Sequence, residues 1–312
     1  MMKVAIPATL AQAGKDYLTK RGYTLIETPD QSAATLAKLA TAADGIILMT
    51  DPFPNDLASQ LPQLKVIARH GVGYDNVDPA FWGQRKTWVT ITPHANAATV
   101  AETTLAAILA VSKNLISATN HLRQNDWAWA GSHKGFDLAG KTLGIMGYGR
   151  IGKMVAQKAR ALDMKLLAYD PFAAADDLVT LVDKETLLKQ ADIVSLHMIV
   201  NTQTTRSIGT AELKMMKSSA TLINFGRAAL VDQAALKHAL QTGELAHAVI
   251  DVFDQEPLPA DDTWRNVPNV ILTPHIASNT NECMARMATD AASEVDRVLT
   301  GQAPQWPVNK LA

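Results

Sequence analysis

Residues 141–170 read KTLGIMGYGRIGKMVAQKARALDMKLLAYD, and this stretch holds the strongest structural signal in the chain. Apolar runs over 142–146 and 165–169 predict two strands, and apolar residues at helical spacing over 151–162 predict a helix between them. Gly147, Gly149 and Gly152 place the pattern G-x-G-x-x-G at the first strand-to-helix turn, and Asp170 follows the second strand. The stretch therefore predicts a βαβ unit with a glycine-rich turn.

This turn has the features of a dinucleotide-binding site. The first glycine permits a tight turn, the second lets a pyrophosphate approach the backbone, and the third lets the helix pack against the strand. The first helical turn offers unpaired N–H groups to the phosphates. Asp170 can accept hydrogen bonds from the adenosine ribose, and its charge would repel a 2′-phosphate, which favours NAD over NADP. A purely structural glycine turn is the alternative interpretation.

A second glycine pattern overlaps the first strand. Residues 135–142, GFDLAGKT, fit the P-loop pattern G-x-x-x-x-G-K-[ST]. A P-loop needs a strand before it and a helix that starts at its Lys-Thr, whereas here an apolar strand follows. We therefore do not predict phosphate hydrolysis at this site.

Composition limits the class of protein. The chain has 312 residues, which is enough for two domains, and its 29 basic and 30 acidic side chains give no electrostatic argument for nucleic acid or an anionic membrane as a partner. No uncharged run approaches transmembrane length and the N-terminus lacks a signal-peptide layout, so we expect a cytoplasmic protein. Cys283 is the only cysteine, which excludes an intrachain disulfide and a multi-cysteine metal site, and we expect it to be a buried thiol.

The order of predicted elements divides the chain. Short apolar runs alternate with helical patterns in the first part, which predicts a parallel, doubly wound sheet. The strands are expected over 3–6, 24–27, 45–48 and 65–69, and the helices over 10–21 and 32–40. Because the glycine turn begins only at Gly147, we expect this first part to be a unit of its own, with the dinucleotide-binding unit inserted after it.

The alternation continues after Asp170 and predicts a second sheet. Strands are expected over 192–196, 221–225, 246–252 and 270–272, and helices over 210–216 and 232–240. A last helix over 280–299 is expected to cross back to the first unit. We therefore predict an α/β protein of two doubly wound parallel-sheet domains: a substrate domain of residues 1–97 and 281–312, and a dinucleotide-binding domain of residues 98–280.

A single long helix is expected over 97–123. It carries an apolar stripe of Leu105, Ile108, Leu109, Leu115, Ile116 and Leu122. At 1.5 Å per residue it would span roughly 40 Å. Glu102, Lys113 and Asn114 argue against a membrane helix. We expect the helix to connect the domains and to pair with a second subunit.

Three polar side chains follow consecutive strands of the second unit. Arg227, Glu256 and His275 come after the strands expected over 221–225, 246–252 and 270–272. Ligands of open parallel sheets lie beyond the carboxyl ends of the strands. Arginine can hold a carboxylate by two hydrogen bonds, and a histidine with a carboxylate partner can move a hydroxyl proton near neutral pH. Any one of these residues alone is more often a surface charge or a cap, but their joint placement predicts hydride transfer to or from a hydroxy acid.

Six segments carry a family resemblance. They are HGVGYDNVD (70–78), ATVAETTLAAILA (98–110), GKTLGIMGYGRIG (140–152), NFGRAALVD (224–232), DVFDQEP (251–257) and NVILTPHIASNT (269–280). With these segments the chain resembles the D-2-hydroxyacid dehydrogenases over nearly its whole length, and most closely D-3-phosphoglycerate dehydrogenase without its C-terminal regulatory domain. The resemblance implies a Rossmann NAD-binding domain inserted into a flavodoxin-like substrate domain.

The resemblance also implies roles for individual residues. Arg227 would bind the substrate carboxylate and polarise the C2 carbonyl, His275 would be the general acid and base, and Glu256 its partner. Val72 and Gly73 would offer backbone N–H groups to the carboxylate. Asp251 would contact the carboxamide of NAD. The full set implied for NAD is Thr104, Gly147, Gly149, Arg150, Ile151, Gly152, Asp170, Phe225, Gly226, Arg227, Asp251, His275, Ala277 and Ser278.

The family pattern further implies a homodimer that uses the helix over 97–123, and domain closure over the substrate. The sequence departs from the family in two places. The run His197-Met198-Ile199-Val200 lacks the proline that often follows the histidine, and Ala228 stands where glycine usually follows the arginine. Both departures concern cofactor contacts rather than Arg227, Glu256 and His275.

The expected reaction is the NAD-dependent interconversion of a D-2-hydroxy acid and its 2-oxo acid, with no metal. Arg69, just before a glycine turn, could meet a phosphate, which favours 3-phosphoglycerate as the substrate. A surface arginine is the alternative, and it leaves open reduction of hydroxypyruvate, glyoxylate or another small 2-oxo acid. An NADH-sensing binding protein of the corepressor type is a third possibility, against which the complete Arg-Glu-His set speaks.

Overall fold

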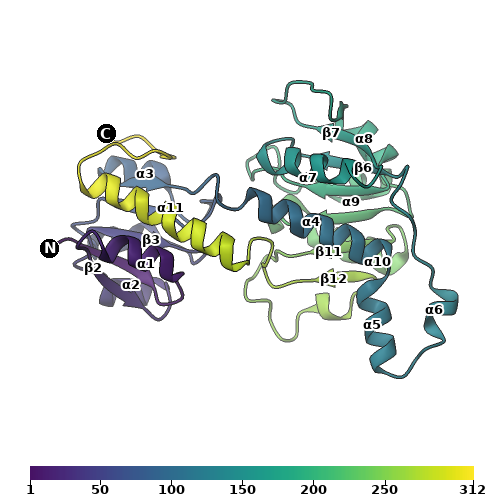
Figure 1. Ribbon diagram of the computed structural model, residues 1–312, viewed down its shortest axis with the longest axis horizontal. Helices are drawn as coiled ribbons and strands as arrows, with labels where there is room; N and C mark the ends of the chain where they lie inside the picture. Colours follow the sequence, from purple (N-terminus) through teal and green to yellow (C-terminus); the bar gives the residue numbers. More distant parts are fainter. The chain divides into compact units, whose positions relative to one another are not determined.

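The computed structural model describes residues 1–312, which form two compact units. The first unit comprises Met1–Asn96 and Asn279–Ala312, and the second comprises Ala97–Ser278. These bounds lie one or two residues from the expected domain limits. Each unit is built on its own parallel sheet, so the predicted α/β class is confirmed (Figure 1).

The first unit has a five-stranded parallel sheet in the order β2-β1-β3-β4-β5, the flavodoxin-like order. The strands are β1 (Lys3–Pro7), β2 (Thr24–Thr28), β3 (Gly45–Leu48), β4 (Val66–Arg69) and β5 (Trp88–Thr90). Residues of β1, β3 and β4 alternate between two apolar clusters, because successive side chains of a strand point to opposite faces. The three-residue strand β5 was not predicted, since so short a segment shows no periodicity.

Helices cover both faces of this sheet. The helices α1 (Gln12–Thr19) and α11 (Asn281–Leu299) pack on one cluster, while α2 (Ala33–Leu39) and α3 (Pro79–Gln84) pack on the other. A Cβ on Gly14 would lie 2.8 Å from Ala288 Cβ, so glycine permits the close contact of α1 with α11. The last helix thus returns to the first unit, as the sequence predicts.

The second unit has a seven-stranded parallel sheet in the order β12-β11-β10-β9-β6-β7-β8. The strands are β6 (Thr142–Met146), β7 (Lys165–Tyr169), β8 (Thr180–Leu181), β9 (Ile193–Leu196), β10 (Thr221–Asn224), β11 (His247–Ile250) and β12 (Val270–Leu272). The strand order reverses at β6, whose neighbours are β7 and β9. In open parallel sheets this switch point is where ligands bind.

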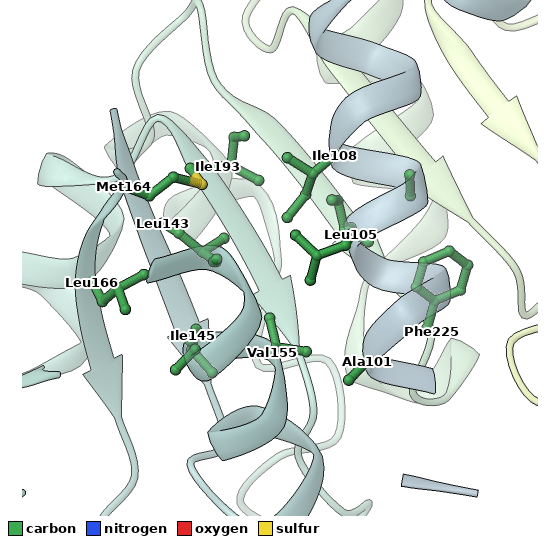
Figure 2. Close-up of a cluster of buried hydrophobic side chains, with 14 of the residues drawn as sticks. Ala101, Leu105, Ile108, Leu143, Ile145, Val155, Met164, Leu166, Ile193 and Phe225 are labelled. Atoms are coloured by element: carbon green, nitrogen blue, oxygen red, sulfur yellow. The ribbon is translucent and has the colours of Figure 1, made fainter. Parts of the chain in front are cut away.

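Two apolar layers sandwich the second sheet. Figure 2 shows one of them, in which Leu105 and Ile108 of α4 (Ala97–Ser112) and Val155 of α7 (Arg150–Arg160) meet Leu143 and Ile145 of β6. The other layer is formed by α8, α9 and α10. These helices span Lys184–Gln190, Thr210–Met215 and Gln233–Thr242.

The helix expected over 97–123 is two helices, so that prediction is wrong. α4 ends at Ser112, and α5 (Leu115–Arg123) continues at an angle of 58°. Asn114 between them has φ +52°, a left-handed conformation that asparagine tolerates better than most residues. No single helix is long and apolar enough to cross a membrane; only α4 and α5 taken together meet that criterion, and α4 is largely buried in the second unit.

Candidate active site

The glycine turn after β6 has the geometry of a phosphate cradle. Gly147 has φ +92°, and a Cβ there would lie 2.6 Å from the carbonyl carbon of His197. A Cβ on Gly152 would lie 2.2 Å from the Gly147 carbonyl oxygen. At Gly149 a Cβ would meet nothing within 4 Å, so open space lies against the backbone where a pyrophosphate would approach.

The N-terminus of α7 adds hydrogen-bond donors to this cradle. Gly149 is its N-cap and has no side chain to cap the first turn, so no cap side chain competes with an anion there. Arg150 and Ile151 are the first two residues of the helix, as expected for cofactor contacts. The residues of this turn therefore fit the pyrophosphate of a dinucleotide.

Asp170 lies at the carboxyl end of β7, beside the glycine turn. Its Oδ2 accepts a hydrogen bond from the Tyr148 amide at 2.9 Å, and its Oδ1 accepts one from the Phe172 amide at 2.9 Å. A carboxylate has roughly four lone-pair sites, so acceptor capacity is left for ribose hydroxyls. The orientation of the carboxylate is set by the protein itself.

The other residues expected to contact NAD differ in how far they are exposed. Thr104 is fully buried and its hydroxyl donates to the Val100 carbonyl at 2.8 Å, so it presents no accessible atom, and the expected contact is not supported. Thr104 is buried because it lies on the face of α4 that packs against the core. Phe225 and Ala277 are also mostly buried, while Gly226 and Ser278 are partly exposed.

Glu256 and His275 form a direct pair. His275 Nδ1 lies 2.7 Å from Glu256 Oε2, and Glu256 Oε1 accepts the Phe253 amide at 2.9 Å. About a third of each side chain is exposed, so the imidazole is held but accessible. Burial raises the pKa of Glu256, but the hydrogen bonds from His275 and Phe253 and the charge of Arg227 outweigh this and lower that pKa overall. Nε2 is then the ring nitrogen left for proton exchange.

His275 itself sits in a strained backbone conformation, with φ +53°. The fully buried Asp251, directly after β11, organises the loop that holds it there. Its backbone carbonyl accepts the His275 amide at 2.9 Å, Oδ1 accepts the Ile276 amide at 2.8 Å, and Oδ2 accepts the Ala277 amide at 2.9 Å. The Thr273 hydroxyl also donates to Oδ1, at 2.6 Å.

This organising role of Asp251 was not predicted from the sequence, which suggested only a carboxamide contact. Burial raises the pKa of Asp251, and the hydrogen bonds from Thr273, Ile276 and Ala277 offset that rise only in part. An acid at the end of a buried strand is the only sequence feature that could have indicated this role. The amides that it binds are some 25 residues further along the chain, so the sequence does not identify them.

Arg227 is positioned by the loop after β10. Asn224, which is 1 % exposed, accepts the Gly226 amide at 3.0 Å through Oδ1 and donates to the Arg227 carbonyl at 2.9 Å through Nδ2. β10, β11 and β12 are neighbours in the sheet, so their loops bring Arg227, Glu256 and His275 to one edge. Asn224 is a positioning residue that the sequence analysis missed, although the short Asn-x-Gly-Arg spacing is typical of a local side-chain turn.

The first unit carries the remaining candidates, on the loop after β4. Arg69 is 3 % exposed; its Nε donates to the Gly73 carbonyl at 2.9 Å and its Nη1 donates to the carbonyls of Leu48 and Met49. Asn76 Nδ2 donates to the carbonyls of Met49 and Asp51. Arg69 and Asn76 therefore join the loops that follow β3 and β4.

This geometry corrects the interpretation of Arg69. A guanidinium that is buried and engaged by carbonyl oxygens does not support the expected contact with a substrate phosphate. Val72 and Gly73, on the loop that Arg69 holds, are partly exposed, and their contact with the carboxylate stays a prediction.

A family model gives this geometry a context. The D-isomer specific 2-hydroxyacid dehydrogenase, NAD binding domain model matches residues 105–277, which include the glycine turn, Asp170, Arg227, Glu256 and His275. The chain belongs to the D-isomer-specific 2-hydroxyacid dehydrogenase family. It is a nicotinamide-dependent oxidoreductase with a Rossmann domain, in agreement with the family predicted from its motifs.

Individual relatives extend the match over both units. A glyoxylate reductase of Korarchaeum cryptofilum is 36% identical over 291 residues, which are 91% of this chain and 88% of that protein. A D-3-phosphoglycerate dehydrogenase of Methanocaldococcus jannaschii is 33% identical over 99% of this chain but only 60% of its own length. The crystal structure of a protein from Thermus thermophilus superposes with a TM-score of 0.92 at 36% identity, covering 98% of this chain and 100% of that one.

Proposed function

We propose that the protein reduces a small, unphosphorylated 2-oxo acid of the glyoxylate or hydroxypyruvate type to the D-2-hydroxy acid, with NADH as the cofactor. Arg69 is the one cation expected to meet a phosphate. The observation that carries this proposal is that its guanidinium donates instead to the carbonyls of Leu48, Met49 and Gly73. The similarity to a glyoxylate reductase over most of both chains supports the same choice. Phosphoglycerate, the first expectation from the sequence, is less well supported.

The side chains of the second unit provide the chemistry. Arg227 holds the carboxylate and stabilises negative charge on the C2 oxygen as the carbonyl is reduced. His275 donates a proton to that oxygen, and Glu256 keeps the imidazole oriented and stabilises its cationic form. When bound, the nicotinamide supplies the hydride to C2, which with the proton from His275 completes the hydroxy acid.

The decisive test is NADH oxidation with a panel of acids: glyoxylate, hydroxypyruvate, pyruvate, 3-phosphohydroxypyruvate and a bulkier branched 2-oxo acid. We expect the highest kcat/KM with glyoxylate or hydroxypyruvate. A strong preference for the phosphorylated acid that Arg69→Ala abolishes would overturn the choice of substrate. Tight NADH binding without turnover of any acid would instead indicate an NADH-sensing binding protein.

We also propose that α5 forms part of a homodimer interface. The helix has no buried residue, and Leu115, Ile116, Leu122 and the following Trp127 are 53%, 44%, 56% and 83% exposed. Figure 1 shows α5 and α6 (Trp129–Ser132) projecting from the rest of the second unit. A cavity of about 410 Å³ lies between these helices and β11 and β12. Apolar side chains gathered on a projecting hairpin favour a second copy as the partner.

Light scattering after size-exclusion chromatography tests the dimer. We expect a dimer for the wild type and a monomer for Leu122→Asp. Leu39→Asp, which changes a 40% exposed leucine on α2, is the matched control and should remain dimeric. A monomeric wild type would contradict the proposal.

A further inference from the structure

Tyr148, the middle residue of Gly147-Tyr148-Gly149, contacts the segment that follows Asp170 at two points. Its amide donates to Asp170 Oδ2 at 2.9 Å, and its hydroxyl donates to Asp176 Oδ1 and Oδ2 at 3.1 and 3.0 Å. The side chain is 2% exposed and belongs to the apolar cluster beneath α7. Burial and the bond to Asp176 raise the pKa of Tyr148, so the hydroxyl remains a donor.

The segment that Tyr148 contacts has little regular structure of its own. It runs in turns and bends from Asp170 to the two-residue strand β8, and Phe172 within it is 90% exposed. Asp176 Oδ1 accepts the amides of Leu178 and Val179 at 3.0 and 3.4 Å, which fixes the entry into β8. Tyr148 therefore secures this segment to the glycine turn near both of its ends.

Asp170 can reject a 2′-phosphate only if it stays where it is. The adenosine ribose of a dinucleotide on this cradle would meet Asp170, and a 2′-phosphate there would face a fixed carboxylate. Residues 171–177 contain two further acids, Asp176 and Asp177, and no cation. Tyr169, just before Asp170, is paired in β7, but the Phe172 amide that orients Asp170 Oδ1 belongs to the segment that Asp176 anchors. Release of that segment from the glycine turn would therefore let the carboxylate turn away from the phosphate.

We propose that Tyr148 is a positioning residue for cofactor choice: by anchoring Asp176 it holds the 170–179 segment where Asp170 accepts the ribose hydroxyls and excludes a 2′-phosphate. This inference rests on the NADH preference contained in the proposed function. It adds a determinant at a position of the glycine pattern that has no fixed residue type.

Equilibrium binding to the full-length protein tests it, because dissociation constants do not depend on catalysis. The dissociation constants of NADH and NADPH are measured by calorimetry for the wild type and for Tyr148→Phe, which removes one hydroxyl and keeps the ring. A hydrogen bond to a charged group contributes enough that the NADPH/NADH ratio of dissociation constants should fall by about tenfold. An unchanged ratio in a folded variant with a lower melting temperature would mean that Tyr148 only stabilises the fold, and would overturn the inference.

Two substitutions of Asp176 distinguish the effect of the anchor on the position of the segment from the effect of the Asp176 charge. Asp176→Asn keeps an acceptor for Tyr148 and loses the charge, so it should retain most of the selectivity, whereas Asp176→Ala should lose it as Tyr148→Phe does. Loss of selectivity in Asp176→Asn but not in Tyr148→Phe would show that charge alone rejects the phosphate, against the proposal. Asp176→Ala also serves as the test should Tyr148→Phe fail to fold.

Lys153 provides the matched control. Its Nζ lies 3.8 Å from Asp176 Oδ2 and 5.2 Å from the Tyr148 ring, but it is not part of the anchor. Lys153→Gln should leave the ratio within about twofold of the wild type, since an exposed ion pair contributes little. A wild type that prefers NADPH would contradict the NADH preference itself, whereas a wild type that prefers NADH with an unchanged ratio in Tyr148→Phe would contradict only the role of Tyr148.

Discussion

Three side chains at this site hydrogen-bond to the backbone of the loops around it. Asp251 and Asn224 each use a buried side chain to shape the loop that presents a residue of the proposed mechanism, His275 in one case and Arg227 in the other. Arg69 does the same for the loop of Val72 and Gly73. Buried polar groups of this kind are costly to leave unpaired, so their partners are held in one arrangement.

Replacement of His275 by glutamine should lower kcat by on the order of 10²–10⁴, because the proton donor for the C2 oxygen is lost. The dissociation constant of NADH should change far less than kcat, since the glycine turn and Asp170, which are expected to hold most of the dinucleotide, keep their bonds. Steady-state kinetics and NADH calorimetry measure the two quantities. Near-normal turnover would remove His275 from the mechanism.

Replacement of Arg69 by methionine should reduce the free energy of unfolding by about 1–3 kcal/mol, because the carbonyls of Leu48, Met49 and Gly73 lose their donor. The KM should rise by a similar factor for phosphorylated and unphosphorylated acids, since the whole loop loosens. Urea denaturation and the acid panel check both effects. A loss confined to the phosphorylated acid would return Arg69 to the role expected from the sequence.

At the scale of elements, the break between α4 and α5 shows that helical periodicity in the sequence does not predict where a helix bends. The apolar stripe of the sequence continues through 113–114, yet the structure bends there and leaves Leu115, Ile116 and Leu122 exposed. A continuous stripe predicts that side chains share a face, but it does not say whether a sheet lies under that face along its whole length. Packing on the sheet ends with α4.

Substitutions of Asn114 test whether its left-handed backbone conformation stabilises the bend between α4 and α5. Asn114→Ala should destabilise the second unit by about 1 kcal/mol, because a Cβ without a local polar group disfavours positive φ. Asn114→Gly should be close to neutral, since glycine adopts this conformation readily. Chemical denaturation of the two variants compares them; equal losses would mean that the asparagine side chain, not the backbone conformation, is what matters.

At the scale of the whole molecule, each unit contains a histidine with a lowered pKa outside the Arg227, Glu256 and His275 set: His70, which is 8% exposed, and His197, which is partly exposed. Burial lowers the pKa of His70 in the first unit and of His197 in the second to about 4. His197 Nε2 lies 2.9 Å from Ser195 Oγ. Both imidazoles are therefore neutral in the folded protein over most of the pH range.

Because the pKa of each of these histidines is lowered in the folded protein, we expect the protein to lose stability in mild acid. Between the unfolded pKa of about 6.5 and the folded value near 4, the unfolded chain binds a proton that the folded chain does not, so stability falls as the pH is lowered through this window. Each histidine contributes at most about 3 kcal/mol, and nothing is lost above pH of about 7. Urea midpoints between pH 7 and 4 should decline less in His197→Gln than in the wild type; parallel curves would contradict the assignment.

The sequence by itself determined the α/β class, the inserted dinucleotide-binding unit, the glycine turn with Asp170, and the placement of Arg227, Glu256 and His275 after neighbouring strands. These features are visible because periodicity, turn glycines and the ends of strands are local properties of the chain. Only the tertiary structure decided the engagement of Arg69, the burial of Thr104, the organising role of Asp251, the bend at Asn114 and the bond from Tyr148 to Asp176. Each of these depends on which segments the folded sheet brings into contact, and a side chain's partner across 20 or more residues is set by strand order and register rather than by its neighbours in sequence.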